Sequence, residues 1–281
     1  MHTARQRTVL IVSPHFVPAS TPDMQRVRTS LPYFRDFGWT PYVLAVEPSP
    51  EDPRDPLLVE TIPADVHIER VTPLPLTLTR RFGIGNIALR AWMSLLRAGS
   101  RTIAKHHIDL VYFSTTMFLS MPLGRIWHSR HGVPFVLDMQ DPWLTDYYET
   151  HPEMPRPAKY GLSHRLHATL EPWTMARAGG IIAVSQSYID TLRRRYPVLA
   201  QRSCATIPFA AAEGDFALLD RRPQPNRLFA PQAGRVNAVY VGRGGNDMAP
   251  ALSILFSAVE RLSRTQPALA AQLRMFFVGT D

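Results

Sequence analysis

Short apolar runs alternate with longer amphipathic segments along most of the chain. Short runs rich in Val, Ile and Leu are typical of strands that are buried on both faces of a parallel sheet. The longer segments repeat their apolar residues with the period of a helix. The runs before residue 222 predict strands at Thr8–Ser13, Pro41–Val46, Val66–Val71, Leu110–Ser114, Pro134–Asp138, Ile181–Val184 and Ala205–Ile207.

The segments between these runs carry helix start and stop signals. Thr21 is an N-cap residue, Pro22 suits the first helical position, and Asp23 suits the positive end of a helix. Gly38 follows the segment and favours the left-handed conformation that ends a helix. The predicted helices are Thr21–Phe37, Ile87–Lys105, Met121–His131, Pro157–Ala178 and Ser187–Tyr196. The alternation predicts an α/β fold, a Rossmann-like doubly wound parallel sheet whose ligands bind outside the carboxyl ends of the strands.

The same pattern begins a second time near the end of the chain. An apolar run at Val236–Gly242 is followed by a glycine-rich loop, a helix at about Met248–Arg264 and a further run at Met275–Gly279. The polar, Pro-rich residues before it are typical of a linker. We therefore predict a first domain at 1–222, a linker at 223–235 and an incomplete second Rossmann-like domain at 236–281.

Composition and charge narrow the class of partner. The chain has 281 residues, is 45% apolar and carries a net charge of +8, so it can build a full core and favours anionic partners. Its single cysteine, Cys204, excludes an intrachain disulfide and suits a reducing compartment. The apolar run Val9–Val12 is too short for a signal-peptide core, and no stretch approaches the length of a membrane helix. These features predict a cytoplasmic protein.

The helix predicted at Ile87–Lys105 has a basic face formed by Arg90, Arg97, Arg101 and Lys105. Such a face is usually solvated, but it also suits docking on the anionic inner face of a membrane, as a peripheral protein does. Aromatic residues are not interleaved with the basic ones, which argues against nucleic-acid binding. The histidine pairs at 128/131 and 164/167 have no third ligand, so we predict no metal site.

Five segments in a fixed order resemble the family 4-like glycosyltransferases with the GT-B fold. The first is VLIVSPHFVPASTPDMQRVRTSLPYFRDFGWTPYVLAV, and the second is GVPFVLDMQDPW. They are followed by LEPWTMARAGGIIAVSQSYIDTL, ATIPFAAAEGDF and YVGRGG. The resemblance implies that a sugar moves from a nucleotide-diphospho-sugar to a glycan or lipid-linked acceptor, as in cell-surface polysaccharide biosynthesis. It implies no cofactor beyond the donor and no obligatory metal, with the acceptor held by the first domain and the donor by the second.

Polar residues at the predicted strand ends are the candidate acceptor-side residues. Asp138 and Asp141 flank the loop after one strand, where a carboxylate can accept the proton of an acceptor hydroxyl or, alternatively, tie down loop amides. His15, Arg26 and Ser114 are candidates for acceptor binding: His15 follows the first strand, Ser114 ends another, and Arg26 could reach a phosphate near the start of the first helix. The alternatives are a solvent-facing loop histidine for His15 and a solvated helix face for the arginines of the first helix, Arg28 above all.

The loop Arg243-Gly244-Gly245 is the candidate donor site. Glycines let the backbone approach a diphosphate, the following helix offers free amides, and Arg243 supplies a fork of donors. The alternative is an ordinary glycine turn.

The sequence is also compatible with two other functions. The family's paired glycines are replaced by Ser20-Thr21-Pro22, its strand-end histidine by Ser114, and its lysine after Arg243 by Met248. These departures favour a non-catalytic interaction protein with the same fold, and they leave room for a nucleotide-sugar epimerase. Because one wall of the donor cleft is missing from the residues given, we expect this chain to bind nucleotide-sugars weakly and to be inactive as it stands.

Overall fold

The computed structural model describes residues 6–157, 159–230, 232–242, 244–245 and 248–279. The chain divides into two compact units, Met1–Asp220 and Arg221–Asp281. The division lies two residues before the predicted end of the first domain.

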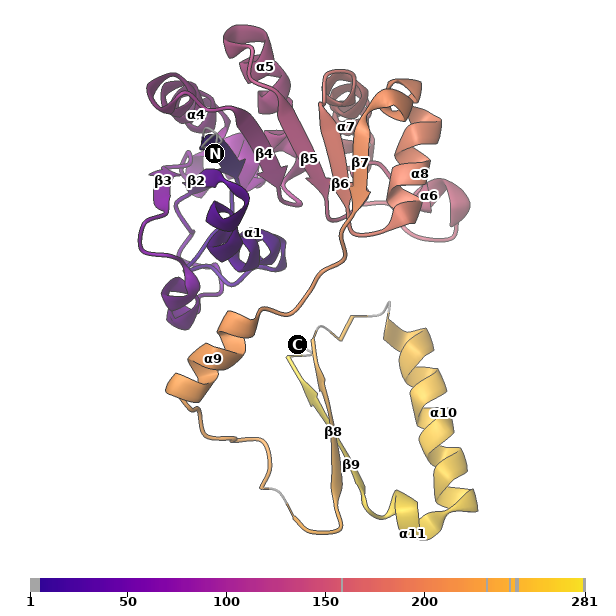
Figure 1. Cartoon of the computed structure of the whole chain (residues 1–281). Coiled ribbons are helices and arrows are strands. Elements are labelled where there is room, and N and C mark those ends of the chain that lie inside the picture. Colours follow the sequence, from indigo (N-terminus) through magenta and orange to yellow (C-terminus); the bar gives the residue numbers. More distant parts are fainter. Residues whose placement is uncertain (1–5, 158, 231, 243, 246–247, 280–281) are drawn as a thin grey trace. The chain divides into compact units, whose positions relative to one another are not determined.

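The first unit contains a seven-stranded parallel sheet (Figure 1). Its strands lie in the order β3-β2-β1-β4-β5-β6-β7, so the order reverses between β1 and β4 and creates a switch point there. The strands are β1 (Arg7–Val12), β2 (Trp39–Val46), β3 (His67–Val71), β4 (Leu110–Ser114), β5 (Phe135–Met139), β6 (Gly180–Ala183) and β7 (Ser203–Thr206). The predicted doubly wound parallel sheet is confirmed, with each strand found within about two residues of its predicted bounds.

Two of the predicted helices are broken. The segment predicted as Thr21–Phe37 is a chain of short 3-10 turns around α1 (Gln25–Ser30), because Pro32 removes a backbone donor in its middle. The segment predicted as Ile87–Lys105 divides at Ala91 into α3 (Ile87–Arg90) and α4 (Trp92–His106). The other helices of this unit are α2 (Leu76–Thr79), α5 (Pro122–His131), α6 (Tyr147–Thr150), α7 (Tyr160–Met175), α8 (Gln186–Arg195) and α9 (Glu213–Arg221).

Apolar side chains of the strands alternate between two cores. On β1, Leu10 and Val12 face the larger core, where Trp127 of α5 is fully buried. Val9 and Ile11 face the smaller core beside Met24 and α1. Helices therefore cover both faces of the sheet, and its polar residues are placed at the strand ends.

The helix α9 was not predicted, and it is held by a buried ion pair. Arg28 of α1 is only 4% exposed, and its Nη2 lies 2.7 Å from Oδ2 of Asp215 on α9. Gln25 and Thr61 accept further hydrogen bonds from the Arg28 guanidinium, at 2.7 and 3.1 Å. The interpretation of Arg28 as part of a solvated helix face is therefore wrong.

The second unit pairs β8 (Val236–Val241) with β9 (Leu273–Val278) in parallel. Two helices, α10 (Ala249–Thr265) and α11 (Pro267–Ala270), lie between the two strands in sequence. No residue of α10 is buried, and Phe256 in its apolar stripe is 51% exposed.

We expect Gly99→Ala to destabilise the first unit by about 1–3 kcal/mol, because there is no room for a methyl group. A Cβ at Gly99 would overlap the indole ring of Trp127, which is fully buried and donates a hydrogen bond to Leu96 O at 3.2 Å. Gly161 on α7 is the matched control, since a Cβ there meets no atom within 4 Å. Denaturant unfolding should show an unchanged or slightly higher stability for Gly161→Ala; equal losses in both variants would contradict the packing argument.

We expect Asp215→Asn to lower the free energy of unfolding by about 1–3 kcal/mol, because it leaves the buried Arg28 charge without a counter-charge. The value is below that of a fully buried pair because the Asp215 side chain is 35% exposed. Asp220→Asn, an exposed change on the same helix, should have little effect on thermal unfolding. An equal response of the two variants would show that the ion pair contributes nothing.

Candidate active site

A cavity of the first unit opens at the carboxyl ends of β1, β4 and β5. It has a volume of about 860 Å³, and its walls come from segments distant in sequence. The loop after β1, the start of α1 and the loops after β4 and β5 form one part of the wall, and the connector at residues 207–212 forms the other. The sheet thus places the cavity beside its switch point, where α/β folds bind ligands.

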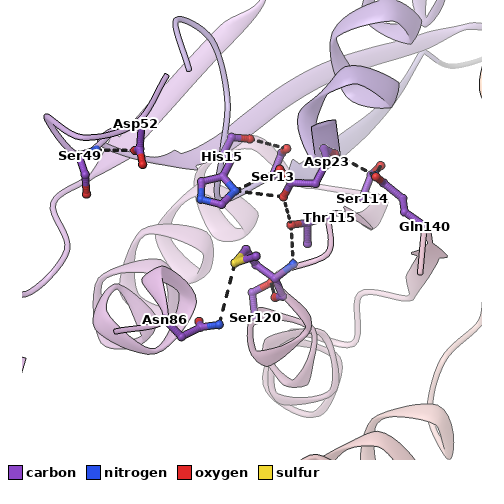
Figure 2. Close-up of polar contacts among 11 residues, drawn as sticks. Ser13, His15, Asp23, Ser49, Asp52, Asn86, Ser114, Thr115, Ser120 and Gln140 are labelled. Atoms are coloured by element: carbon purple, nitrogen blue, oxygen red, sulfur yellow. Dashed lines mark hydrogen bonds and ion pairs between the residues drawn. The ribbon is translucent and has the colours of Figure 1, made fainter. Parts of the chain in front are cut away.

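His15 and Asp23 form a pair at the wall of this cavity (Figure 2). Nδ1 of His15 lies 3.1 Å from Oδ1 of Asp23, and Thr115 donates a hydrogen bond to Oδ2 of Asp23 at 2.8 Å. The side chain of Asp23 is 5% exposed and that of His15 is 16% exposed. Because the carboxylate engages Nδ1, the imidazole has its Nε2 left for a ligand in the cavity.

The two members of the pair shift each other's pKa. Burial lowers the pKa of His15, but the hydrogen bond and the negative charge of Asp23 outweigh burial and raise it above its usual value. Burial raises the pKa of Asp23, but the contacts with His15 and Thr115 outweigh it and lower the pKa. An anionic Asp23 that stabilises a protonated imidazole is the arrangement expected of a general base and its orienting carboxylate.

Hydrogen bonds connect this pair to the end of β5 (Figure 2). Gln140 donates from Nε2 to Asp23 O at 2.9 Å and to Ser114 Oγ at 3.0 Å. Ser114 donates in turn to Asp138 Oδ2 at 2.7 Å, and Tyr112 donates to the same oxygen at 3.1 Å. Ser114 is fully buried, so its contact is with the protein and not with the cavity.

Arg26 joins this network to the connector. Its Nε lies 2.8 Å from Asp138 Oδ2, and its Nη2 donates to Ile207 O at 2.6 Å. Its guanidinium carbon lies 4.8 Å from the ring centroid of Phe209. Arg26 lines the cavity but is 8% exposed, and these contacts occupy much of its guanidinium.

The structure does not bring Asp138 to the cavity surface. Its side chain is fully buried and is not among the residues that line the cavity. Burial raises its pKa, against the opposing effects of Ser114, Arg26 and Tyr112. The geometry therefore favours a positioning role for Asp138 rather than proton transfer to a ligand.

Asp141 does lie at the cavity, in the exposed loop after β5. Desolvation raises its pKa, and the negative charge of Asp23 raises it further. Of the two carboxylates predicted as catalytic, Asp141 is the one that a ligand in the cavity can contact.

Sequence reasoning missed Asp23, Thr115 and Gln140 as site residues. Asp23 carried a signal, but it was interpreted only as a favourable charge at a helix start. Thr115 and Gln140 each follow a predicted strand by one or two residues. The rule that selected His15 and Ser114 would have found them if it had been applied to every strand end.

The predicted donor loop follows β8 in the second unit. Gly244 is exposed and Gly245 is partly buried, whereas Arg243 lies outside the described residues. Within the described part of the chain, no group of three or more His, Cys, Asp or Glu residues could hold a metal ion. His167 instead accepts a hydrogen bond from Trp143 Nε1 at 2.6 Å.

Comparisons with known proteins agree with this architecture. The structure of UGT2 from Phytolacca americana is 14% identical, with a TM-score of 0.56 over 97% of this chain and 72% of that one. The same protein complexed with UDP-2fluoro-glucose and pterostilbene is 15% identical, with a TM-score of 0.54 over 98% of this chain and 71% of that one. Likeness at this identity shows the fold alone. A comparison with curated proteins gives no significant match.

The family model of the glycosyl transferase 4-like domain matches residues 24–209. The match begins at Met24, immediately after Asp23, and ends at Phe209, which packs on Arg26. It thus contains the strands β2 to β7 and most of the cavity wall. Because the family model matches well over half of the residues of the chain, the chain belongs to the glycosyl transferase 4-like family.

Proposed function

We propose that the protein transfers a sugar from a nucleotide-diphospho-sugar to a hydroxyl of a glycan or lipid-linked acceptor, in the synthesis of cell-surface polysaccharide. The observation that carries this proposal is the His15–Asp23 pair at the wall of a large cavity beside the switch point. Family membership supports the reaction class. The complex of Phytolacca americana UGT2 with UDP-2fluoro-glucose and pterostilbene supports a nucleotide-sugar donor in this fold.

In the proposed reaction, His15 is the general base. Asp23 holds Nδ1–H, so Nε2 carries the lone pair that takes the proton from the acceptor hydroxyl. The acceptor oxygen forms a bond to the anomeric carbon of the donor while the bond from that carbon to the diphosphate oxygen breaks. The electron pair leaves with the nucleoside diphosphate. The anionic Asp23 stabilises the imidazolium that forms.

The donor side of the proposal rests on the second unit. Arg243, Gly244 and Gly245 are proposed to bind the diphosphate through the guanidinium and the backbone amides. No helix of the described residues is long and apolar enough to cross a membrane. We propose that the enzyme works in the cytoplasm, against the inner face of the membrane where a lipid-linked acceptor would lie.

Because the given residues alone are expected to be inactive, the reaction class is tested on a protein that carries these residues together with a complete donor-binding domain. That protein is incubated with uridine- and guanosine-diphospho-sugars, with and without glycan and lipid-linked acceptors. Transfer of the sugar to an acceptor supports the proposal. Conversion of the donor to an isomeric nucleotide-sugar without an acceptor would identify an epimerase, and neither reaction with any donor would favour a non-catalytic protein.

His15→Gln should lower kcat/KM for sugar transfer by about 10²- to 10⁴-fold, because it removes the proton acceptor. His131→Gln is the control, since His131 is an exposed histidine at the end of α5. Circular dichroism should show both variants folded. Activity of His15→Gln close to that of the unchanged protein would exclude His15 as the base.

The acid limb of the pH–rate profile should report the pKa of His15. Asp23 raises this pKa above its ordinary value, and the base must be unprotonated, so kcat/KM should fall as pH drops through the raised pKa. Asp23→Asn removes the charge, so the pKa of His15 should fall and the limb should move to lower pH. A limb that stays in place would show that another group titrates.

Asp138→Asn should destabilise the first unit by about 3–5 kcal/mol, since it leaves the buried charge of Arg26 without a partner. Asp141→Asn is the matched control, because Asp141 is exposed and should change stability by no more than about 0.5 kcal/mol. Chemical unfolding of the two variants measures the difference. If Asp138→Asn kept full stability yet lost turnover, the catalytic interpretation of Asp138 would be restored.

A further inference from the structure

An apolar and basic surface follows the carboxyl end of β3. Leu74, Leu78, Phe82 and Met93 are 54%, 53%, 78% and 51% exposed, and the exposed Arg80 and Arg81 lie among them in sequence. We call these six residues the loop surface. Single exposed leucines are common on protein surfaces, whereas exposed apolar side chains that are grouped with cations mark interaction sites.

Hydrogen bonds attach the start of the segment that carries the loop surface to the helices α3 and α4. The amide of Leu74 donates to Arg90 O at 3.0 Å, and Arg90 Nε donates back to Leu74 O at 2.8 Å. Ser94 donates from its hydroxyl to Thr72 O at 3.2 Å. These bonds fix the start of the loop along α3 and α4, and the apolar side chains that follow are exposed.

The sequence that carries this surface has charged residues of one sign. No Asp or Glu occurs between Glu69 and Asp109 in the sequence. The basic helix face predicted from the sequence is different in the structure. Arg90 is 8% exposed and faces inward to Leu74, and Arg101 is paired with Glu69 at 3.2 Å. Arg97 and Lys105 of that face are exposed, but Lys105 lies at the end of α4 away from Met93. The exposed cations within the loop surface itself are Arg80 and Arg81.

The loop surface connects to the candidate active site. Asn86, which ends the loop, donates from Nδ2 to the sulfur of Met117 at 4.0 Å (Figure 2). Met117 lines the cavity that contains His15. The segment that carries the loop surface thus reaches the wall of the cavity through Asn86.

We propose that the loop surface docks on an anionic lipid bilayer, with its apolar side chains among the upper acyl chains and Arg80 and Arg81 at the headgroup phosphates. Such a mixture of apolar and cationic side chains matches the interface of a bilayer, where both kinds of group find partners. A second copy of the chain is a poorer occupant. A two-fold contact through this surface would bring together two copies of the same cationic patch, with no acidic residue between Glu69 and Asp109 in the sequence to offset the charge.

The docking surface stands on exposure and charge, and it holds whether or not His15 is the base. If sugar transfer occurs as proposed, docking also favours an acceptor anchored in the membrane over a free glycan. Loss of vesicle binding and loss of turnover are separate measurements, so failure of one proposal is distinguishable from failure of the other.

The test is flotation of the full chain with vesicles of phosphatidylcholine that contain about 30% phosphatidylglycerol, a proportion that gives an anionic surface. Binding to vesicles of phosphatidylcholine alone should be at least tenfold weaker, and binding to anionic vesicles should fall as salt is raised. Phe82→Ser combined with Leu78→Ser should weaken binding by about tenfold or more. Arg80→Ser combined with Arg81→Ser should weaken it by a similar factor.

Matched control variants distinguish binding through the loop surface from non-specific binding to vesicles. Phe37 is 79% exposed but precedes the amino end of β2, whereas the loop surface follows the carboxyl end of β3, so Phe37→Ser should leave binding unchanged. Arg193→Ser with Arg194→Ser removes the same charge from exposed positions on α8 and should weaken binding much less than the Arg80 and Arg81 changes.

Equal effects of test and control variants, or binding that does not depend on lipid charge, would overturn the proposal. A chain that is dimeric in sedimentation and becomes monomeric only in the Phe82 variant would assign the surface to self-association instead.

Discussion

The buried charge of Arg26 holds three parts of the first unit together: the end of β5, the first helix and the connector at residues 207–212. A guanidinium removed from water needs a counter-charge, and the contacts of Arg26 come from more than one segment of this fold. Asp138 at the end of β5 provides the counter-charge, and the connector provides the carbonyl of Ile207 and the ring of Phe209. The strand end, the first helix and the connector are therefore fixed together, and the cavity is the space that they enclose.

This arrangement gives two nearby carboxylates opposite tasks. Asp23 is hydrogen-bonded to an imidazole and a hydroxyl, and its pKa is lowered, whereas the pKa of Asp138 is raised by complete burial. Environments that separate the pKa values of neighbouring groups are characteristic of acid–base sites. Gln140 and Ser114 connect the two, so the orientation of Asp23 depends on packing that begins at Arg26. Substitutions in the buried network should therefore affect His15 without touching it.

The sheet could be predicted from the sequence because its signal is local. Buried parallel strands are nearly continuous apolar runs, and the run Leu110–Ser114 gave the observed bounds of β4 without correction. The site could be predicted only in part. His15 and Asp141 were found from their places after strands, but the roles of Arg26, Arg28 and Asp138 depend on partners far away in sequence. Arg28 is polar and helical, which locally describes a solvated residue, and only the position of Asp215 explains its burial. Arg90 was likewise predicted on an exposed basic face, but it is buried because its partner, the carbonyl of Leu74, lies 16 residues away in the sequence.

The two buried arginines also bear on where the first domain ends. The family model stops at Phe209, yet Asp215, the counter-charge of Arg28, lies beyond it. A chain that ended with the family match would leave Arg28 4% exposed with only the neutral acceptors Gln25 and Thr61 for its charge. Removing one partner of a largely buried pair typically destabilises by a few kcal/mol, which is a large part of the stability of an ordinary domain. The connector and the first turns of α9 are thus as much a part of the first unit as its strands. The cavity wall at residues 207–212 is held by Arg26, which contacts Ile207 and Phe209, and by the pair of Arg28 with Asp215 just after it.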